Sequence, residues 1–438
     1  MSLLIRASVC SAILTLGLAG CNNTTNGIVD SRVSQTAVLK TYADIALATY
    51  EDSLTQAVVL HKSIEKLVME PSETNLILAK QAWKNARVPY QQSEAYRFGN
   101  PVVDDWEGKV NAWPLDEGLI DYVDASYGGS SDENDLYLAN VINSQTININ
   151  GTMVDVSNIT PALIGNTLHE AEEVESNVAS GYHAIEFLLW GQDLNGTGPG
   201  AGARPASDYD VNNCSNGNCG RRGDYLLAAS TLLQTDLKDI VAAWQPRSIS
   251  SWTVEGEARK NLTQNKTDDG ISAMITGMGS LSYGELAGER MKLGLMLNDP
   301  EEEHDCFSDN THNSHYYDAM SIQNVYLGEY QRIDGTLVEG TSLSSLVAQA
   351  SPQLDARMKG SLEFTMKQMQ VMVERAHSTE SYDQMIASGN KAGNQVVQDI
   401  VDSLTAQTSV IEELDTALLL GQLAFEGSDS LDNPSTIQ

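Results

Sequence analysis

Apolar residues recur at helical spacing through most of the chain, and this pattern constrains the fold more than any other feature. In residues 36–68 they stand three or four positions apart, as on the buried face of an amphipathic helix. Pro71 ends that run, and Ser72 with Asn75 begins another that continues to residue 98. Similar runs cover residues 165–189, 224–244, 267–297, 314–330, 344–351, 352–377 and 381–423. The pattern predicts an all-α fold.

Strand signals gather in one short segment. Residues 146–156 are rich in β-branched residues around Asn150-Gly151, a dipeptide typical of tight hairpin turns. We therefore expect at most a minor β-hairpin beside the helices. The folded body, about 400 residues long, exceeds the usual size of a single core. We expect two antiparallel helical bundles with a cleft between them.

Composition suggests where the parts of the chain begin and end. A segment rich in Gly, Asn and Pro separates two helical halves. The predicted parts are a signal peptide (1–20), a flexible tether (21–35), an N-terminal bundle (36–200), a cysteine-containing loop (201–223), a C-terminal bundle (224–425) and a disordered tail (426–438).

The first residues have the form of an export signal. Arg6 is the only charged side chain among the first twenty, and an apolar run ends in Leu-Ala-Gly before Cys21. The run is too short for a membrane span, and small residues before a cysteine are typical of bacterial lipoproteins. We expect Cys21 to be lipidated and to anchor the protein in the cell envelope, in the outer membrane since no Asp follows at Asn22. The alternative is an ordinary cleaved signal with a chance cysteine.

The charge balance narrows the class of partner. The chain has 26 basic and 59 acidic side chains, a net charge of −33. Such a charge repels nucleic acid and favours cations. Solubility alone, or adaptation to salt, would explain it equally well.

The remaining cysteines divide into a pair and a single residue. Cys214 and Cys219 lie close together in a loop rich in Gly and Asn, and in an oxidising compartment we expect them to form a disulfide. A metal knuckle is the weaker interpretation, because the chain has no second cysteine pair. Cys306 is left over, and it is either buried, free or a soft metal ligand.

A short polar motif interrupts an apolar helix. The sequence from Gly181 to Glu186 is Gly-Tyr-His-Ala-Ile-Glu, and an apolar run from Phe187 to Trp190 follows. His183 and Glu186 are three residues apart and share one helical face. Both side chains can ligate zinc or ferrous iron. The other interpretation is that they are simply buried and hydrogen-bonded.

A second polar constellation follows near residue 300. Acidic residues, histidines and Cys306 crowd into residues 301–315. We expect a metal or partner site at the same cleft, around Glu303, His304 and Asp305. The alternative is a solvated loop that caps the next helix. For the neighbouring pair Glu285 and Glu289, exposure is the simpler explanation and a bridging cation the other.

Several blocks together resemble the imelysin-like family, which is also catalogued with the metallopeptidases, and its iron-regulated protein A branch. The Gly-x-His-x-x-Glu motif with its apolar continuation looks like the signature of that family. The similarity extends over about residues 40–425. The other blocks that resemble it are residues 83–90 with Glu94 and Phe98, residues 111–116, residues 219–226 and residues 302–312.

The resemblance implies a two-domain helical fold, export or lipid anchoring, and a link to iron regulation and uptake, including components of iron transport. It implies that His183 and Glu186 are metal ligands and that Glu94 faces them from an early helix. Its bound group would be a divalent metal, iron or zinc, or haem. The side chains expected around it are Arg87, Arg97, Trp113 and Asp116.

Three functions remain open. The first is a lipid-anchored protein that binds iron, or an iron-bearing ligand such as haem, in uptake. The second is a metallopeptidase, although the chain has no His-Glu-x-x-His string, since His169-Glu170 lacks the second histidine. The third is a structural or adhesion lipoprotein whose polar cluster only joins two domains.

Overall fold

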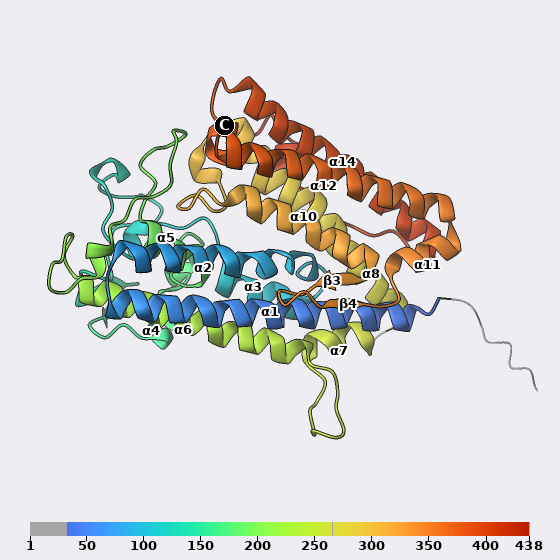
Figure 1. The fold of residues 1–438 in the computed structure, drawn as a ribbon, viewed down its shortest axis with the longest axis horizontal. Coiled ribbons are helices and arrows are strands. Elements are labelled where there is room, and N and C mark those ends of the chain that lie inside the picture. Colours follow the sequence, from blue (N-terminus) through green and yellow to red (C-terminus); the bar gives the residue numbers. More distant parts are fainter. Residues whose placement is uncertain (1–32, 265, 438) are drawn as a thin grey trace, which may run out of the picture. The chain divides into compact units, whose positions relative to one another are not determined.

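The structure of the protein, a computed structural model, describes residues 33–264 and 266–437, which belong to one compact unit. The helices of the unit are α1 (Gln35–Met69), α2 (Glu73–Gln91), α3 (Pro101–Asn111), α4 (Pro161–Leu163), α5 (Gly181–Trp190), α6 (Cys219–Trp244), α7 (Glu257–Thr263), α8 (Thr267–Ser280), α9 (Leu293–Leu297), α10 (Thr311–Leu327), α11 (Leu343–Ala350), α12 (Pro352–Ser378), α13 (Tyr382–Ile386), α14 (Lys391–Leu418) and α15 (Asp429–Asp432) (Figure 1). This arrangement confirms the predicted all-α class.

Short 3-10 and π-helical segments and two β-hairpins complete the secondary structure of the described residues. The 3-10 and π segments are η1 (Glu94–Tyr96), η2 (Glu117–Leu119), η3 (Ala125–Tyr127), η4 (Ile164–Leu168), η5 (Ala171–Glu173), η6 (Ala206–Tyr209), η7 (Leu281–Lys292) and η8 (Pro300–Glu302). Strand β1 (Thr146–Ile149) pairs with β2 (Thr152–Asp155), which is the predicted hairpin. A second hairpin, β3 (Glu329–Gln331) with β4 (Leu337–Glu339), was not predicted.

Helix α1 organises the first group of helices. It packs along α2 and α6, and the Ser34 hydroxyl accepts a hydrogen bond from the Ala37 amide at its start, a typical N-cap. Its buried residues are three or four positions apart and therefore lie on one face. They include Val38, Leu39, Tyr42, Ile45, Ala46, Leu60, Ile64 and Leu67.

An aromatic cluster fills the space where α1, α3, α6 and η1 meet. The ring centroid of Tyr42 lies 5.0 Å from that of Tyr96 and 6.1 Å from that of Trp244. The centroids of Tyr50 and Trp106 are 5.6 Å apart at 85°, one of the favourable edge-on geometries of aromatic pairs. Because Tyr96 belongs to η1, the cluster holds this short segment, and with it Glu94, against α1.

Helices α10, α12 and α14 form a second group. Helix α12 packs against α10 and α14, and η7 packs against α14. Figure 1 shows this group stacked above α1, α2 and α3. Helix α10 also contacts α2 and η1, so it joins the two groups.

Two predicted helical runs are broken in the structure. Residues 165–189 form one helix only from Gly181 onward, because Glu170, Glu172 and Glu173 adopt left-handed backbone angles upstream. Residues 381–423 form α13 and then α14, separated by Gly389 with a φ of +85°. These corrections share one cause: isolated backbone reversals interrupt stretches whose apolar spacing is helical.

The domain boundaries stay a prediction, but two details bear on them. Helix α6 begins at Cys219, inside the predicted loop of residues 201–223, and packs against α1 and α5 of the first half. The predicted disordered tail contains α15, which packs against η7 and buries Ser428 and Ser430. The tail prediction is therefore wrong for this segment.

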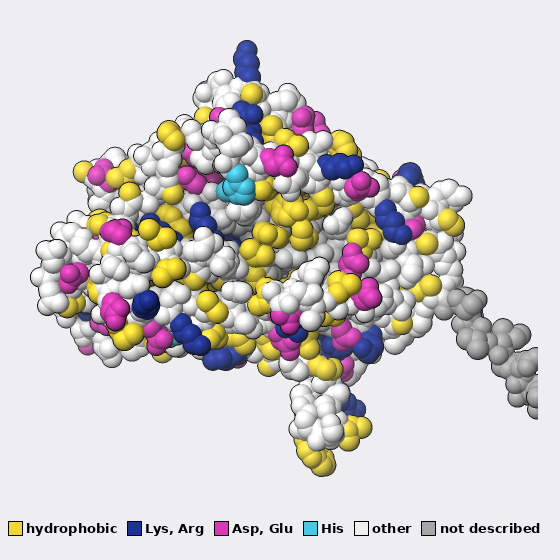
Figure 2. Space-filling model, viewed as in Figure 1, with side chains coloured by type: hydrophobic (Ala, Val, Ile, Leu, Met, Phe, Trp, Pro, Cys, Tyr) yellow, Lys and Arg dark blue, Asp and Glu magenta, His cyan; other side chains and the backbone are white. Residues whose placement is uncertain are grey.

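Residues 245–256, between α6 and α7, project from the unit (Figure 2). The exposed apolar side chains of this segment are Ile249, Trp252 and Val254. Within the described part of the chain, no helix is both long and apolar enough to span a lipid bilayer.

Candidate metal centre

The geometry of α5 begins with a glycine. Gly181 has a φ of +79°, and a Cβ at this position would lie 2.4 Å from the carbonyl oxygen of Val110 on α3. Only glycine tolerates both the left-handed angle and this close approach. One residue later, the Tyr182 carbonyl accepts a hydrogen bond of 2.9 Å from the Trp83 indole on α2. The helix therefore starts in a fixed position between α2 and α3, with every one of its side chains buried.

His183 and Glu186 lie together on the buried face of α5. His183 Nδ1 and Glu186 Oε2 are 3.0 Å apart and share a hydrogen bond. The other carboxylate oxygen of Glu186 accepts a hydrogen bond of 3.0 Å from the Ser308 amide. Burial, and after it the charge of Asp305, raises the pKa of Glu186 well above its ordinary value. Glu186 thus orients the imidazole and ties α5 to residues 303–310, here called the connecting segment.

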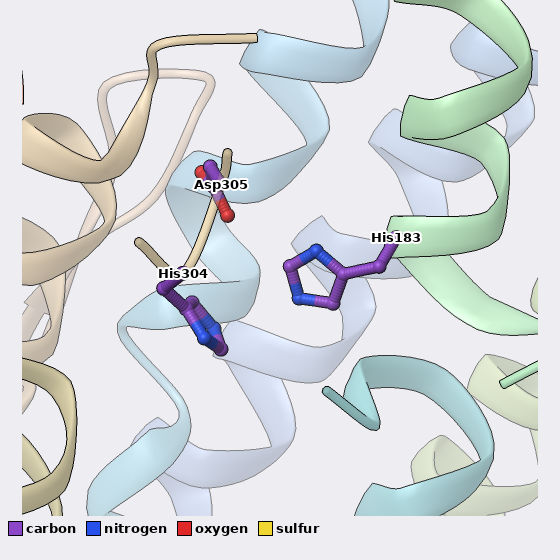
Figure 3. Close-up of side chains that lie close together, drawn as sticks. All are labelled: His183, His304 and Asp305. Atoms are coloured by element: carbon purple, nitrogen blue, oxygen red, sulfur yellow. The ribbon is translucent and has the colours of Figure 1, made fainter. Parts of the chain in front are cut away.

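The connecting segment joins η8 to α10 and brings His304 and Asp305 to His183. The imidazole centroids of His183 and His304 are 4.8 Å apart at 75°. One donor atom from each of the three side chains lies within 4.8 Å of the other two. Figure 3 shows His183 reaching from α5 toward His304 and Asp305 on the connecting segment. We call these three residues the His–Asp centre.

Three imidazole nitrogens of the centre have no hydrogen-bond partner among the described residues. They are His183 Nε2 and both ring nitrogens of His304, and both side chains are at least 97% buried. Buried polar atoms are normally hydrogen-bonded. Unpartnered imidazole nitrogens beside a carboxylate are the donor set that a borderline divalent metal requires, so the residues present fit a metal ion.

Burial keeps both imidazoles of the centre neutral. Burial, followed by the charge of Arg87, lowers the pKa of His183 to about 3. Burial is also the largest cause that holds the pKa of His304 well below its ordinary value, with Arg290 next. Metals bind the neutral imidazole through its lone pair, so both rings are in the ligating form at neutral pH.

Asp305 is held in its charged form. Its carboxylate accepts hydrogen bonds from Arg87 at 2.9 Å, from the Asn310 amide group at 2.9 Å and from the Ser314 hydroxyl. Burial alone would raise the pKa of Asp305, but Arg87 and these donors hold it below its ordinary value. The carboxylate is therefore available as an anionic ligand with a fixed orientation.

Comparison of the sequence with known protein families gives one match over most of the chain. A family model described as imelysin matches residues 46–411. The chain belongs to the imelysin family. The match covers most of α1 through α14, including all three residues of the His–Asp centre.

Two proteins similar to this chain are both named as iron-regulated protein A. Iron-regulated protein A of Synechococcus elongatus is 29% identical over 115 residues, which are 25% of this chain and 30% of the relative's length. This imelysin chain thus spans under a third of that relative. The crystal structure of a provisionally named iron-regulated protein A precursor from Parabacteroides distasonis covers 87% of this chain and 97% of its own, with a TM-score of 0.60 and 18% identity. That likeness establishes the fold.

The structure pairs Glu94 with Arg290, and Glu94 is not among the three residues of the His–Asp centre. Its carboxylate accepts a hydrogen bond of 2.8 Å from Arg290 of η7. The same guanidinium donates to Asp318 at 3.0 Å and to Glu285 at 2.7 Å. Glu94 thus belongs to a buried network centred on Arg290, and its expected role toward His183 and Glu186 stays a prediction. Nothing in the local sequence spacing pointed to Arg290 or Asp318.

The other predicted residues have separate surroundings. The Trp113 ring lies edge-on to His304, with centroids 5.8 Å apart. Arg97 donates to Asp104 at 3.0 Å and lines a cavity that His304 also lines. Asp116 accepts hydrogen bonds from Asn134 and Ser176, which hold the surrounding loop in place.

Three predictions outside the centre have different outcomes. Glu303 precedes His304, but its carboxylate joins a different group of acids. Cys214 and Cys219 form a disulfide. The predicted lipidation site, Cys21, lies outside the described residues.

A cavity of about 370 Å³ opens onto the His–Asp centre through His304. The cavity is lined by Trp113, Asn111 and several acidic and basic side chains. Its acidic residues are Glu107, Glu285, Glu289 and Glu302, and its basic residues are Arg97 and Arg290. The acids outnumber the bases, so the cavity favours the entry of a cation.

Proposed function

We propose that the protein is an exported, lipid-anchored member of the imelysin family that binds iron at the His–Asp centre and acts in iron uptake. The guest is ferrous iron, or an iron-bearing ligand such as haem. A component of an iron-transport system would receive it. The proposal places the protein in the bacterial cell envelope, attached through Cys21 to the outer membrane.

One observation carries this proposal. Two buried imidazoles present three nitrogens without hydrogen-bond partners in the described structure, next to a carboxylate held in its charged form. Leaving such atoms unpaired costs about 1–3 kcal/mol each. A bound metal ion would remove that cost for one nitrogen of each ring, because it pairs with the lone pair of each imidazole and with the carboxylate together.

Each residue of the centre has a distinct part. His183 through Nε2, His304 and Asp305 would hold the ion. In the tautomer that binds a metal, His183 Nδ1–H donates to Glu186, which leaves the lone pair on Nε2 and fixes the plane of the ring. Arg87 and Ser314 hold Asp305 in place. Iron bound there would supply a redox-active Lewis acid with positions left open.

The names of the relatives support iron over zinc. Iron-regulated protein A of Synechococcus elongatus and the Parabacteroides distasonis chain are both described by their regulation by iron. The donor set itself suits either metal. The cavity with an acidic lining gives a cation a route to His304, and the net charge of −33 favours cations near the surface.

Geometry favours binding over peptide hydrolysis. A metallopeptidase needs a carboxylate poised to activate water beside the metal. Glu186 is the nearest candidate, and both of its oxygens are engaged, one with His183 and the other with Ser308. We therefore rank the metallopeptidase below the binding protein. A purely structural role would leave the unpartnered nitrogens of His304 without an explanation.

Metal analysis of chain purified without chelators tests the proposal. Elemental analysis should find about one equivalent of iron, or a haem absorbance band should appear if haem is the guest. After chelation, anaerobic calorimetry with ferrous iron should show one site. His304→Ala and His183→Ala should each weaken binding by on the order of 100-fold, since each removes a ligand.

The matched control is His61→Ala. His61 lies on α1, where its Nδ1 is hydrogen-bonded to Ser230 at 2.8 Å. It belongs neither to the His–Asp centre nor to the residues that line the cavity beside it. This variant should bind iron like the wild type. Equal affinity of His304→Ala and wild type, with both folded, would reject the proposed site.

A further inference from the structure

A second group of metal-ligating side chains lies beside the His–Asp centre and is not explained by it. Glu303 and Asp309 belong to the connecting segment, and Asp383 lies in the first turn of α13. One carboxylate oxygen from each lies within 4.8 Å of the other two. We call these three residues the carboxylate cluster.

One oxygen of each carboxylate in the cluster lacks a donor, whereas the other oxygen of Asp383 accepts a hydrogen bond from Ser381. Glu303 is 1% exposed and Asp383 is fully buried. Glu303 Oε1, Asp309 Oδ1 and Asp383 Oδ2 are each enclosed without a hydrogen-bond partner in the described residues. An enclosed carboxylate oxygen without a donor is uncommon in folded proteins. Three of them at one place indicate that a group outside the polypeptide pairs with them.

The electrostatic environment of the cluster indicates that this group carries a positive charge. Burial, and next the neighbouring carboxylate of Asp383, raise the pKa of Asp309 to about 7. Burial raises the pKa of Asp383 to about 6. Three carboxylates repel one another here, so a cation would stabilise all of them.

One lysine offsets part of this charge. Lys84 of α2 donates a hydrogen bond of 3.2 Å to the Ser308 carbonyl, and its positive charge acts on Asp309. Asp193 adds a further negative charge that acts on both Asp309 and Asp383. The region therefore keeps an excess of at least two negative charges when its acids are ionised, which matches a divalent ion.

We propose that the carboxylate cluster binds a hard divalent cation of the size of calcium. Oxygen ligands lie about 2.3–2.6 Å from Ca²⁺, so two of them on one ion are at most about 5 Å apart. The spacing of 4.8 Å or less satisfies this limit without rearrangement. An octahedral Mg²⁺ ion, with ligands at about 2.1 Å, needs a tighter group. An all-oxygen set also separates this site from the imidazole centre in metal preference.

The cation would join the connecting segment to α13. Glu303 is directly followed by His304 and Asp305, so an ion that fixes Glu303 also limits the motion of the His–Asp centre. Upstream of the connecting segment, Asn298 at the end of α9 already contacts α13 by donating a hydrogen bond of 2.7 Å to the Ile386 carbonyl. The inference does not depend on the proposed function, because the two sites differ in residues and in ligand chemistry.

Calcium titration of the full mature chain tests this site. After treatment with a chelator, calorimetry should detect one Ca²⁺ with a Kd on the order of 10⁻⁴ M or tighter, and Mg²⁺ should bind more weakly. Calcium at several millimolar should raise the melting temperature. Asp383→Asn should weaken calcium binding at least about tenfold and abolish the thermal shift, because it removes one anionic ligand.

Three variants make the result decisive. Asp239→Asn, at an exposed position on α6, should bind calcium like the wild type. Asp309→Asn, at a less buried position, should repeat the loss if Asp383→Asn does not fold. His304→Ala should leave calcium binding intact, so a failure of the iron site and a failure of this site are distinguishable.

The stability of the variant in the absence of calcium distinguishes a calcium ligand from an acidic residue with only a structural role. Asp383→Asn should be at least as stable as wild type in chelator, because it removes one of three repelling carboxylates. Wild-type chain that binds no calcium would overturn the proposal. So would an Asp383→Asn variant that binds calcium normally, or one that is equally destabilised with and without calcium.

Discussion

The single guanidinium of Arg290 is the common ion-pair partner of three acidic side chains. Its side chain is 3% exposed, and it donates to Glu94, Glu285 and Asp318 at 2.7–3.0 Å. Its charge acts on the pKa of His304 as well. Burying ions is costly unless each has a partner, so these acids depend on Arg290 for their place in the core.

Replacing Arg290 should therefore be severe. Arg290→Met keeps much of the side-chain volume but leaves Glu94 and Asp318 buried without a counter-ion. We expect the free energy of unfolding to fall by about 3–5 kcal/mol in urea denaturation. Arg357→Met, which breaks an exposed pair with Glu413, should cost less than about 1 kcal/mol. Similar losses in both variants would contradict the importance given to the buried network.

Asp236 gives a pH-dependent prediction. Burial raises its pKa from 3.8 to about 6, with Asp239 adding to the effect and Lys109 opposing it. The pKa is higher in the folded state than in the unfolded state, so folding carries a cost that grows as pH rises from about 4 to about 6. Above that range the cost is complete.

Asp236→Asn should remove this cost. We expect the variant to be more stable than wild type by about 1 kcal/mol at pH 8, a value discounted for solvent screening. At pH 4.5 the gain should fall to about a third of that. Denaturant unfolding at the two pH values measures both. A gain that is the same at pH 4.5 and pH 8 would show that ionisation of Asp236 is not its cause.

Helix α5 depends on one backbone contact. Gly181 sits against the Val110 carbonyl of α3 with a left-handed φ, and His183 is on the first turn that follows. Any side chain at Gly181 must push α5 away from α3. The imidazole would then move relative to the connecting segment, where His304 and Asp305 are fixed by other contacts.

Gly181→Ala should consequently impair both stability and metal binding. We expect a loss of about 2 kcal/mol or more, because the backbone angle is strained and Val110 cannot retreat. Gly360→Ala is the matched control, since a Cβ at this exposed position of α12 meets no atom within 4 Å. It should stabilise the protein by about 0.5–1 kcal/mol. Melting temperatures and iron calorimetry of both variants provide the measurement.

The sequence predicts elements well where periodicity is local. The runs at residues 36–68 and 352–377 became α1 and α12 within one residue at each end, because their apolar faces and serine caps act within a turn or two. Helices α3 and α7 were missed. Their 11 and 7 residues are too few for a clear period, and α3 is held by tertiary contacts such as the hydrogen bond from Trp106 to Asp236.

The residues of the His–Asp centre were each named from the sequence, but their grouping was not. His183 was paired with Glu186 and Glu94, whereas His304 and Asp305 were assigned to a second site. The hydrogen bond that unites the two segments joins Glu186 and Ser308, 122 positions apart. Local spacing shows which residues share a helix face, but it does not show which face meets which segment.

On the scale of the whole unit, the centre lies where distant parts of the chain converge. Arg87 comes from α2, His183 from α5, and Asp305 from the segment before α10. Helix α10 in turn contacts α2 and η1. Separation of the two helical groups would therefore dismantle the centre, so metal binding and the cooperativity of unfolding should be linked.

The same unit has to stay at the membrane if it acts in uptake, and Cys21 is the residue we propose for that task. Metabolic labelling with a clickable fatty acid, in a bacterial host with lipoprotein processing, should mark the wild-type protein. The labelled protein should partition into the detergent phase. Cys21→Ser should abolish both, because a single thiol carries the lipid.

Cys306→Ser is the control for this experiment, since Cys306 is the free cysteine among the described residues. That variant should still be labelled and remain in the detergent phase. If Cys21→Ser kept its label, the lipid would be attached elsewhere. If the wild type were exported but unlabelled, the export signal would be an ordinary cleaved one, and the iron site would then belong to a freely diffusing protein with no fixed distance to a transporter.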